Sequence, residues 1–317
     1  MPIEPGSLDE HPFVSVVISN LNGAEVLGEC LDSLRRLTYP NYEVVVVDAQ
    51  SDDGSCDLVE RSFPWVKLIK ARRIGVGEAI NIGIRASKGR LIAFDFNNDE
   101  VAHPSWLSSL VEVIKESDDI GIVGGTRVFH GSDNRIFEAG MKLDFFFHTH
   151  QRHRLKRIDD IPMELVNVDY VAVGLFRREL IDEIGWFDED YYFYGEDADF
   201  CLRTRRRGYR VVNVPWALTS VKGSLTVGEG SPRQIYFSRR AGIRLVLKFK
   251  SFSPLLLCVL ERLLLLFAEA TIDVINCLSG SRTAKPTNAA AAFRAYTWTL
   301  RKASLTVRAG TEMKKRS

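Results

Sequence analysis

Three short polar segments follow hydrophobic runs in the first third of the chain. Their side chains are hydroxyls, amides and carboxylates, which can hydrogen-bond a small ligand. The candidate binding residues are Ser19, Asn20, Asn22, Asp48, Asn97, Asn98 and Asp99. In open α/β sheets, ligands bind beyond the carboxyl ends of the strands. We therefore expect these segments to form a binding site if the hydrophobic runs are parallel strands.

Asp48 is the most informative of these residues. It directly follows the run YEVVVV, whereas the turn-forming residues Asp53, Gly54 and Ser55 come later in the same segment. Turn chemistry accounts for those three residues, but it does not explain an acid directly after a strand that is buried on both faces. The position of Asp48 therefore favours a ligand-binding role.

Asp99 is a candidate metal ligand. Mg²⁺ and Mn²⁺ take oxygen ligands, and they commonly lie between a protein carboxylate and the phosphates of a substrate. One carboxylate beside Asn97 and Asn98 is a thin site if the protein alone must hold the ion. It is adequate if a diphosphate supplies the other ligands. By itself the segment is a weak signal for a cation that is shared with a phosphorylated substrate.

A second acidic cluster contains Glu196, Asp197 and Asp199, and it lies between the aromatic run 191–194 and an arginine-rich helix. The helix dipole favours acids at this position, which is one explanation. An aromatic wall beside a carboxylate is also typical of a general base in a partly desolvated sugar pocket, where burial raises the pKa of the acid. The residues alone leave both explanations open.

The segment Gly75-Val76-Gly77 resembles part of a dinucleotide-binding fingerprint. However, Ile80 occupies the position of the third glycine, and the segment belongs to the third strand-helix unit instead of the first. This is a weak signal for a nicotinamide cofactor. We interpret the segment as a tight turn into a helix.

The elements that must position these residues alternate between strand and helix patterns. We expect strands at 13–18, 42–47, 66–70, 90–95 and 120–124, and helices at 23–37, 57–62, 77–86 and 104–115. Residues 125–168 read as irregular or short antiparallel strands, followed by a helix at 178–184, an acidic loop at 187–197, a helix at 198–207 and a strand at 209–214 that ends at Pro215. From Gln234 the pattern is helical, with a linker at 279–288. The fold class is α/β, with an open, mostly parallel, Rossmann-like sheet flanked by helices and a C-terminal helical extension.

Charge and cysteine content argue against several classes of protein. The chain has 42 Lys and Arg against 41 Asp and Glu, and this balance argues against a nucleic acid partner. Five cysteines with no CxxC pair make a zinc ribbon or a disulfide framework a poor explanation. The first twelve residues lack the pattern of a signal peptide, so we expect a reducing, cytoplasmic location.

The segment from Ser253 to Leu278 is apolar apart from Glu261, Arg262, Glu269 and Asp273. These four fall on one side of a helix. A helix of this kind suits a membrane surface, a second subunit in a homo-oligomer, or packing within the protein. The sequence leaves these three partners open.

Taken in order, these segments resemble the inverting family 2 glycosyltransferases, which have the GT-A fold. The similarity covers roughly residues 13–250, and its most specific part is GWFDEDYYFYGEDADFCLRTRRRGYRVVNVP, which is similar to the rhamnosyltransferase-like branch. The resemblance implies a catalytic domain at 1–230, with a nucleotide-sugar half at about 13–124 and an acceptor half at about 125–230. The remaining residues, 231–317, would form a C-terminal helical region, for which a membrane surface is one of the three partners left open above.

The resemblance also implies roles for particular residues. Asp48 would contact the nucleobase with Asn20 nearby, Asp99 would be the acid that binds Mg²⁺ or Mn²⁺, and Asp197 would be the catalytic base, preceded by its partner Glu196. The implied reaction is transfer of a sugar from a nucleotide-sugar donor to a hydroxyl of a glycan or lipid-linked acceptor with inversion, on the inner face of the cell membrane.

Three departures from the family pattern bear on activity. Ser19 and Asn20 replace the usual Pro and Thr, Asn97 replaces the first acid of the metal motif, and Val221 stands where many relatives have a metal-binding histidine. The last two departures motivate an alternative function, a non-catalytic nucleotide-sugar-binding or scaffold protein on the same fold.

Overall fold

The computed structural model describes residues 8–223, 230–278 and 287–316. The first residues of the chain and most of the predicted linker at 279–288 lie outside this description. The chain divides into two compact units. The first contains Met1–Lys142, His150–Tyr192 and Glu196–Thr226, and the second contains Leu143–Thr149, Phe193–Gly195 and Val227–Ser317.

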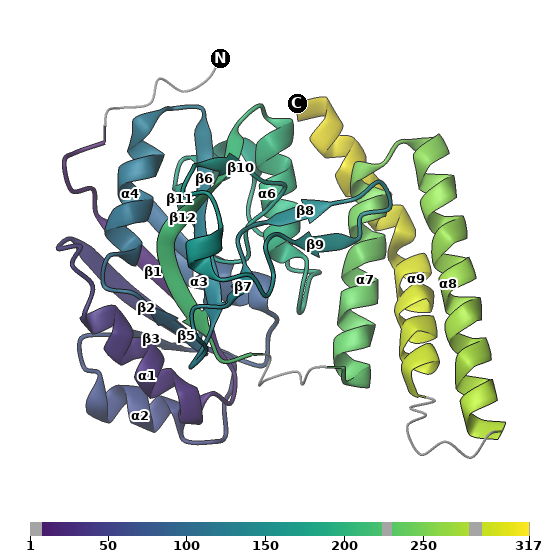
Figure 1. Ribbon diagram of the computed structural model, residues 1–317, viewed down its shortest axis with the longest axis horizontal. Helices are drawn as coiled ribbons and strands as arrows, with labels where there is room; N and C mark the ends of the chain where they lie inside the picture. The colour runs from purple at the N-terminus through teal and green to yellow at the C-terminus, as the bar shows by residue number, and fades with distance from the viewer. Residues whose placement is uncertain (1–7, 224–229, 279–286, 317) are drawn as a thin grey trace. The chain divides into compact units, whose positions relative to one another are not determined.

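The first unit is built on a mixed sheet with helices on both faces (Figure 1). Its strands are β1 (Val14–Asn20), β2 (Tyr42–Asp48), β3 (Lys67–Lys70), β4 (Leu91–Asn97), β5 (Glu100–Ala102), β6 (Ile120–Phe129), β7 (Ile136–Glu138), β10 (Val166–Asn167), β11 (Gly174–Arg177) and β12 (Arg210–Val221). Its helices are α1 (Ala24–Arg35), α2 (Ser55–Ser62), α3 (Val76–Ala86), α4 (Trp106–Glu116), α5 (Leu180–Ile184) and α6 (Glu196–Arg206), with a short 3₁₀ turn at Ile158–Asp160. A separate two-stranded sheet pairs β8 (Met141–Leu143) with β9 (Thr149–Gln151).

The strand order is β10-β12-β6-β11-β4-β1-β2-β3, with β5 paired to β12 and β7 paired to β6. Strands β1 to β4 form the predicted parallel core, in which Asn20 at the end of β1 lies opposite Asp48 at the end of β2. Strands β6 and β12 also pair in parallel. This register brings the polar segments after β1 and β2 to the same edge of the sheet.

Hydrophobic packing fixes the layers. One face carries α1, α2 and α4, whose Leu31, Val59 and Trp106 share a buried cluster with Val16 and Val46 of the sheet. The opposite face carries α3, which packs on β1 and β2. On that face, the ring of Phe94 in β4 lies 5.9 Å from the ring of Phe200 in α6. The continuous Val run of β2 is therefore buried on both sides, as its composition predicts.

Several elements differ from the sequence expectation, among them β5, which was not predicted, and β6, which continues to Phe129. The predicted strand at 209–214 does not end at Pro215, because β12 continues to Val221. Its register with β6 shifts between Asn213 and Leu218, and such an irregularity accommodates a proline that cannot donate a ladder hydrogen bond. β11 was not predicted, and it lies antiparallel between β4 and β6. α6 begins at Glu196, two residues before the expected start.

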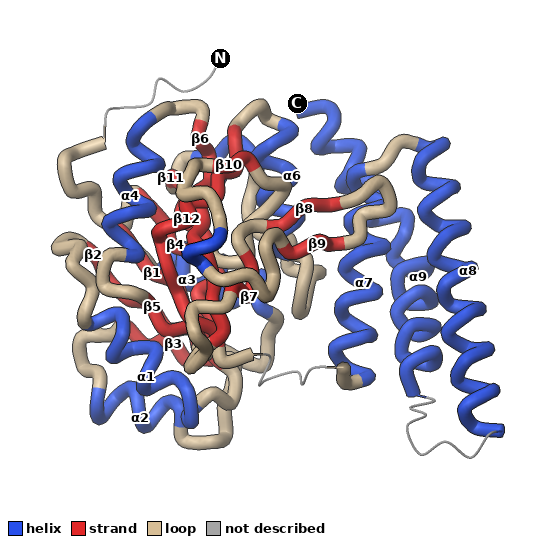
Figure 2. Tube along the Cα trace, in the orientation of Figure 1, coloured by secondary structure: helices blue, strands red, loops and turns tan. Residues whose placement is uncertain are grey.

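The second unit is mainly helical (Figure 2). It contains α7 (Pro232–Phe249), α8 (Phe252–Leu278) and α9 (Thr287–Arg316), each of which packs against the other two. α7 begins with a side-chain cap, in which Ser231 Oγ accepts a hydrogen bond from the backbone N–H of Gln234 at 3.1 Å. Among the helices that the structure describes, none has the combination of length and hydrophobicity needed to cross a membrane.

Candidate active site

The ends of β1, β2 and β4 are joined by a chain of buried side-chain hydrogen bonds. Asn20 Nδ2 donates to Asp48 Oδ2 at 2.7 Å, and Asn98 Nδ2 donates to Asn20 Oδ1 at 2.8 Å. All three side chains are at least nine-tenths buried. The structure therefore brings together three of the predicted nucleotide-binding residues.

Ser51 completes this network. Its backbone N–H donates to Asp48 Oδ1 at 2.9 Å, and its hydroxyl donates to Asp48 Oδ2 at 2.7 Å. The same hydroxyl accepts from the backbone N–H of Asn22 at 2.9 Å, and Asn22 Oδ1 in turn accepts from Asp52 N–H at 3.0 Å. The carboxylate of Asp48 thus holds the loops after β1 and β2 in one arrangement.

Gly23 is part of this site, although it is not among the predicted binding residues. A Cβ atom at position 23 would lie 2.0 Å from Asn98 Nδ2 and 2.5 Å from Asn20 Oδ1. Only glycine lets the start of α1 approach the amide pair this closely. Ser19 and Asn97 flank the network, since their backbones pair between β1 and β4; the side chain of Asn97 lies outside the description.

Asp99 lies in the turn between β4 and β5. It is buried, and its backbone carbonyl accepts the N–H of Lys222 at 3.2 Å. Burial, followed by the negative charge of Glu100, raises the pKa of Asp99 to about 6. A carboxylate in this environment gains from a nearby cation.

The chain itself offers few ligands for a metal ion. Val221, at the end of β12, pairs with Glu100 next to Asp99 and contributes no donor atom. Within the described residues, no group of three or more His, Cys, Asp or Glu side chains is arranged to hold a metal. The residues fit a cation only as a shared one, with Asp99 as the protein carboxylate and substrate oxygens and water completing the coordination.

Asp197 lies in the first turn of α6, where it is half-buried. The N–H of Ala198 donates to its Oδ1 at 2.7 Å. Burial raises the pKa of Asp197 to about 7, and the negative charge of Glu138 adds to this effect. A carboxylic acid with a pKa in this range can accept a proton near neutral pH. Glu196 precedes it and is buried.

Arg127 links the surroundings of Asp99 and Asp197. Its Nε donates to Glu100 Oε1 at 2.7 Å, and its Nη1 lies 3.5 Å from Glu138 Oε1. All three side chains of this buried ion cluster are at least nine-tenths buried. The positive charge of Arg127 opposes the effect of burial on the pKa of both Asp99 and Asp197. The two acids therefore share one electrostatic environment.

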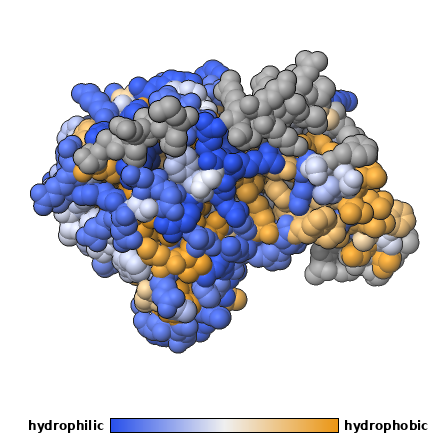
Figure 3. All heavy atoms as spheres, turned by 90° about the horizontal axis from the view of Figure 1, so that it is seen from above, coloured by the Kyte–Doolittle hydropathy of each residue, from blue (hydrophilic) through white to orange (hydrophobic). Residues whose placement is uncertain are grey.

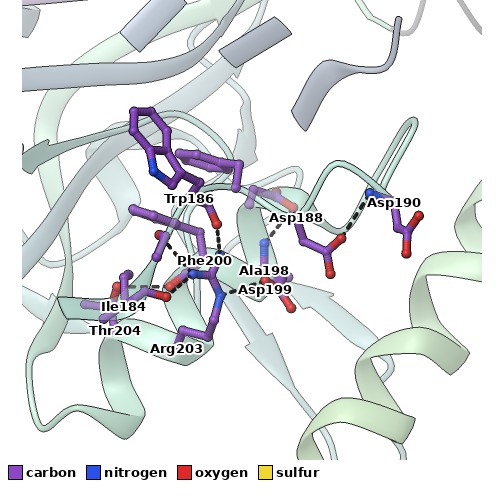
Figure 4. A network of polar contacts seen from close by, with 12 residues as sticks. Ile184, Trp186, Asp188, Asp190, Ala198, Asp199, Phe200, Arg203 and Thr204 are labelled. Atoms are coloured by element: carbon purple, nitrogen blue, oxygen red, sulfur yellow. Dashed lines mark hydrogen bonds and ion pairs between the residues drawn. The ribbon is translucent and has the colours of Figure 1, made fainter. Parts of the chain in front are cut away.

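Asp199 has a structural role. Its Oδ2 accepts from Arg203 Nε at 2.8 Å, and Arg203 also donates to the carbonyl oxygens of Ile184, Gly185 and Trp186. Figure 4 shows this guanidinium surrounded by the acceptors. The pair ties the turn after α5 to α6, so it fixes the base of the acidic loop.

The two glycines of the incomplete fingerprint position the acidic loop. A Cβ atom at Gly75 would lie 2.6 Å from Tyr192 Cα, and one at Gly77 would lie 2.9 Å from the Asp188 carbonyl oxygen. Asn81 of α3 strengthens the contact, because its side chain exchanges hydrogen bonds with the backbone of Phe187 at 2.9 and 3.1 Å. The Gly-x-Gly pattern thus permits loop packing.

Comparison with known proteins gives a consistent result. Residues 15–185 match the family described as Glycosyl transferase family 2. The chain is 34% identical over 130 residues to the uncharacterized glycosyltransferase alr2836 of Nostoc sp., covering 40% of each protein. It is 29% identical over 206 residues to the glycosyltransferase AglE of Haloferax volcanii, covering 62% of this chain and 63% of AglE. The chain therefore spans less than two thirds of the length of either relative.

Among solved structures, the mannosyltransferase PcManGT from Pyrobaculum calidifontis, in complex with GDP-Man and Mn²⁺, aligns over 100% of this chain and 89% of its own. The TM-score is 0.55 and the sequence identity is 19%. At this identity the likeness establishes a shared fold.

Proposed function

The chain belongs to glycosyl transferase family 2, and from this premise we propose that it transfers a sugar from a nucleoside-diphosphate sugar to an acceptor hydroxyl with inversion. The acceptor that we propose is a glycan or a lipid-linked saccharide. The observation that carries the proposal is the pairing of a hydrogen-bonded polar network at the ends of β1, β2 and β4 with an aspartate whose pKa is about 7.

The polar network would bind the nucleotide. Asp48 would accept hydrogen bonds from the nucleobase, and Asn20 and Asn98 would contact the nucleotide beside it. The oxygens of Asp48 accept hydrogen bonds from Asn20 and Ser51. Nucleobase recognition would therefore use the remaining acceptor capacity of a carboxylate that is already oriented.

Asp197 would act as the general base. As the acceptor oxygen attacks the anomeric carbon, its proton passes to the Asp197 carboxylate and the new carbon–oxygen bond forms. The bond from the sugar to the diphosphate breaks on the opposite face, and its electron pair leaves with the nucleoside diphosphate. A base with a raised pKa holds the transferred proton better than an ordinary aspartate.

Asp99 would hold Mg²⁺ or Mn²⁺ together with the diphosphate of the donor. When bound there, the ion supplies charge neutralisation for the leaving group. The arrangement of the described residues supports a weak protein contribution, so we expect metal affinity to rise when donor is present.

A non-catalytic nucleotide-sugar-binding protein is the second candidate. It is favoured by Val221 beside Asp99 and by the small number of metal ligands. The two functions share donor binding and differ only in turnover.

A panel of UDP-, dTDP- and GDP-sugars tests the proposal. Thermal shift with and without Mn²⁺ identifies the donor that binds, and release of nucleoside diphosphate from that donor measures turnover. We expect slow release that increases with acceptor. A donor that stabilises the protein and is never consumed, with any acceptor saccharide supplied, would favour the binding protein.

A further inference from the structure

Helix α8 has its charged side inward. Arg262 is 4% exposed, and its Nη2 donates to the carbonyl oxygen of Phe146 at 2.9 Å. Glu261 Oε1 lies 3.2 Å from His148 Nε2. Both contacts are with the segment Leu143–Thr149, which belongs to the same unit.

Glu269, about two helical turns after Glu261, follows the same pattern. It forms an ion pair with Arg239 of α7. The charged residues of α8 whose side chains are described thus all make contacts within the second unit. The polar stripe seen in the sequence is an internal face.

The outward face of α8 is apolar over most of its length. Its large side chains are each more than half exposed, and they are Leu256, Leu257, Leu260, Leu263, Leu264, Phe267, Ile272 and Ile275. In Figure 3 hydrophobic side chains gather at the right-hand end of the view, where α8 lies. From Leu256 to Ile275 this face extends about 28 Å, at 1.5 Å per residue. A continuous apolar surface of this size marks an interaction site.

The charge of the second unit selects the partner. Residues 227–317 contain sixteen Lys and Arg and five Asp and Glu, a formal net charge of +11. Residues 1–226 contain 26 basic and 36 acidic residues, a net charge of −10. The near-neutral total therefore conceals a strongly basic unit joined to an acidic one.

Some of these cations are used internally. Arg244 and Lys248 of α7 are buried, and Arg239 is paired with Glu269. Arg294 and Arg301 of α9 are exposed. A basic unit repels a second copy of itself and is attracted to an anionic surface.

We propose that the second unit docks on an anionic phospholipid bilayer, with the outward face of α8 lying in the boundary between head groups and acyl chains. An amphipathic helix with an apolar face, carried by a basic unit, binds in this way without crossing the membrane. The attachment that we propose is peripheral, through the apolar face of this helix. This inference does not depend on the reaction catalysed.

Flotation of the full chain with vesicles tests the proposal. One set of vesicles is phosphatidylcholine alone, and in the other phosphatidylglycerol replaces part of it. We expect flotation with the anionic set at low salt, weaker flotation at high salt, and little with the zwitterionic set. A full chain that stays at the bottom of the gradient with both sets would overturn the proposal.

Variants separate the apolar and the charged contributions. The double variant Leu264→Asp/Phe267→Asp changes exposed side chains and should reduce anionic binding about tenfold or more. Met163→Asp, an exposed apolar residue of the first unit, is the matched control and should bind like the parent. Arg294→Glu/Arg301→Glu should weaken binding to a similar degree through charge alone, which keeps the test decisive if the first variant unfolds.

Light scattering after size exclusion tests the alternative that a second copy of the chain covers this face. A dimer that the Leu264→Asp/Phe267→Asp variant splits, with no vesicle binding by the parent, would assign the face to a second copy. Vesicle binding that is equal in the parent and in both double variants would place the lipid contact elsewhere and overturn the proposal.

Discussion

Two aspartates of the candidate site show how environment changes the role of the same side chain. Asp48 accepts hydrogen bonds from Asn20 and from both the N–H and the hydroxyl of Ser51. Asp197 accepts an N–H bond from Ala198, and burial raises its pKa to about 7. The hydrogen bonds fix the orientation of the Asp48 carboxylate, whereas burial of Asp197 disfavours its charged form. The first environment suits recognition and the second suits proton transfer.

The largest expected effect is that of Asp197→Asn on turnover. The amide keeps the shape of the side chain but cannot accept the proton, so kcat should fall about 10²–10⁴-fold, and donor affinity should stay within about twofold. Steady-state rates and donor titration measure the two quantities. Asp182→Asn, an exposed acid on α5, should leave both unchanged.

The same experiment on Glu196 sharpens the assignment. Glu196→Gln should retain more activity than Asp197→Asn. If only Glu196→Gln loses turnover, the base is Glu196.

Asp99→Ala should abolish stimulation by Mn²⁺, because it removes the only carboxylate in the segment Asn97-Asn98-Asp99. Asn97→Asp restores the first acid of the metal motif and should tighten metal binding. Rates measured across a Mn²⁺ titration report both changes, with the exposed Asp57→Ala as a control. Full metal stimulation in Asp99→Ala would place the ion elsewhere.

Asp48→Ala should weaken donor binding by at least about tenfold, because a hydrogen bond to a charged group contributes roughly 1.5–3 kcal/mol. The residue also holds the loops after β1 and β2, so the loss can exceed this value. Calorimetric titration with the nucleoside diphosphate measures it. Asp52→Ala removes a neighbouring exposed carboxylate and should bind normally; equal affinity in the two variants would remove Asp48 from the nucleotide site.

The smallest predicted effect is a shift of the pH profile in a Glu138 variant. Asp197 must be ionised to act as a base, so kcat/KM should fall about tenfold per pH unit below its pKa of about 7. Glu138→Gln removes a nearby negative charge and should lower that pKa, which moves the acid limb to lower pH by a few tenths of a unit to about one unit. A limb that moves upward, or one that persists in Asp197→Asn, would mean that another group titrates.

The parallel half of the fold could be predicted because its signals are local. The Val run of β2 and the acid at its end are adjacent in sequence, and the strand–helix alternation requires that they meet the ends of β1 and β4. β11 has only four residues, GLFR, which carry no periodic pattern, so it was missed. The sequence pattern predicts that β12 ends at Pro215, because proline is a strong local stop signal. Only the pairing with β6 shows that the strand continues past this residue.

The site residues that the sequence did not predict depend on contacts between distant parts of the chain. Arg127 and Glu138 affect Asp197 although they lie on β6 and β7, far from it in sequence. The sequence predicts only a turn at Gly75 and Gly77, because the backbone atoms that pack against these glycines belong to residues 188 and 192. These residues come more than a hundred positions later in the chain. The sequence showed the two faces of α8, but it could not show that the charged one turns inward.

The position of β11 has a consequence for how the chain acquires its structure. Its neighbours β4 and β6 are complete once residue 129 has been made, yet the strand between them begins at Gly174. During synthesis, both neighbours therefore expose unpaired edges until β11 emerges, and open edges are prone to pair with other chains. A fragment that stops before Gly174 should aggregate instead of yielding a small nucleotide-binding piece, and dependence on chaperones should be greatest for nascent chains of this length.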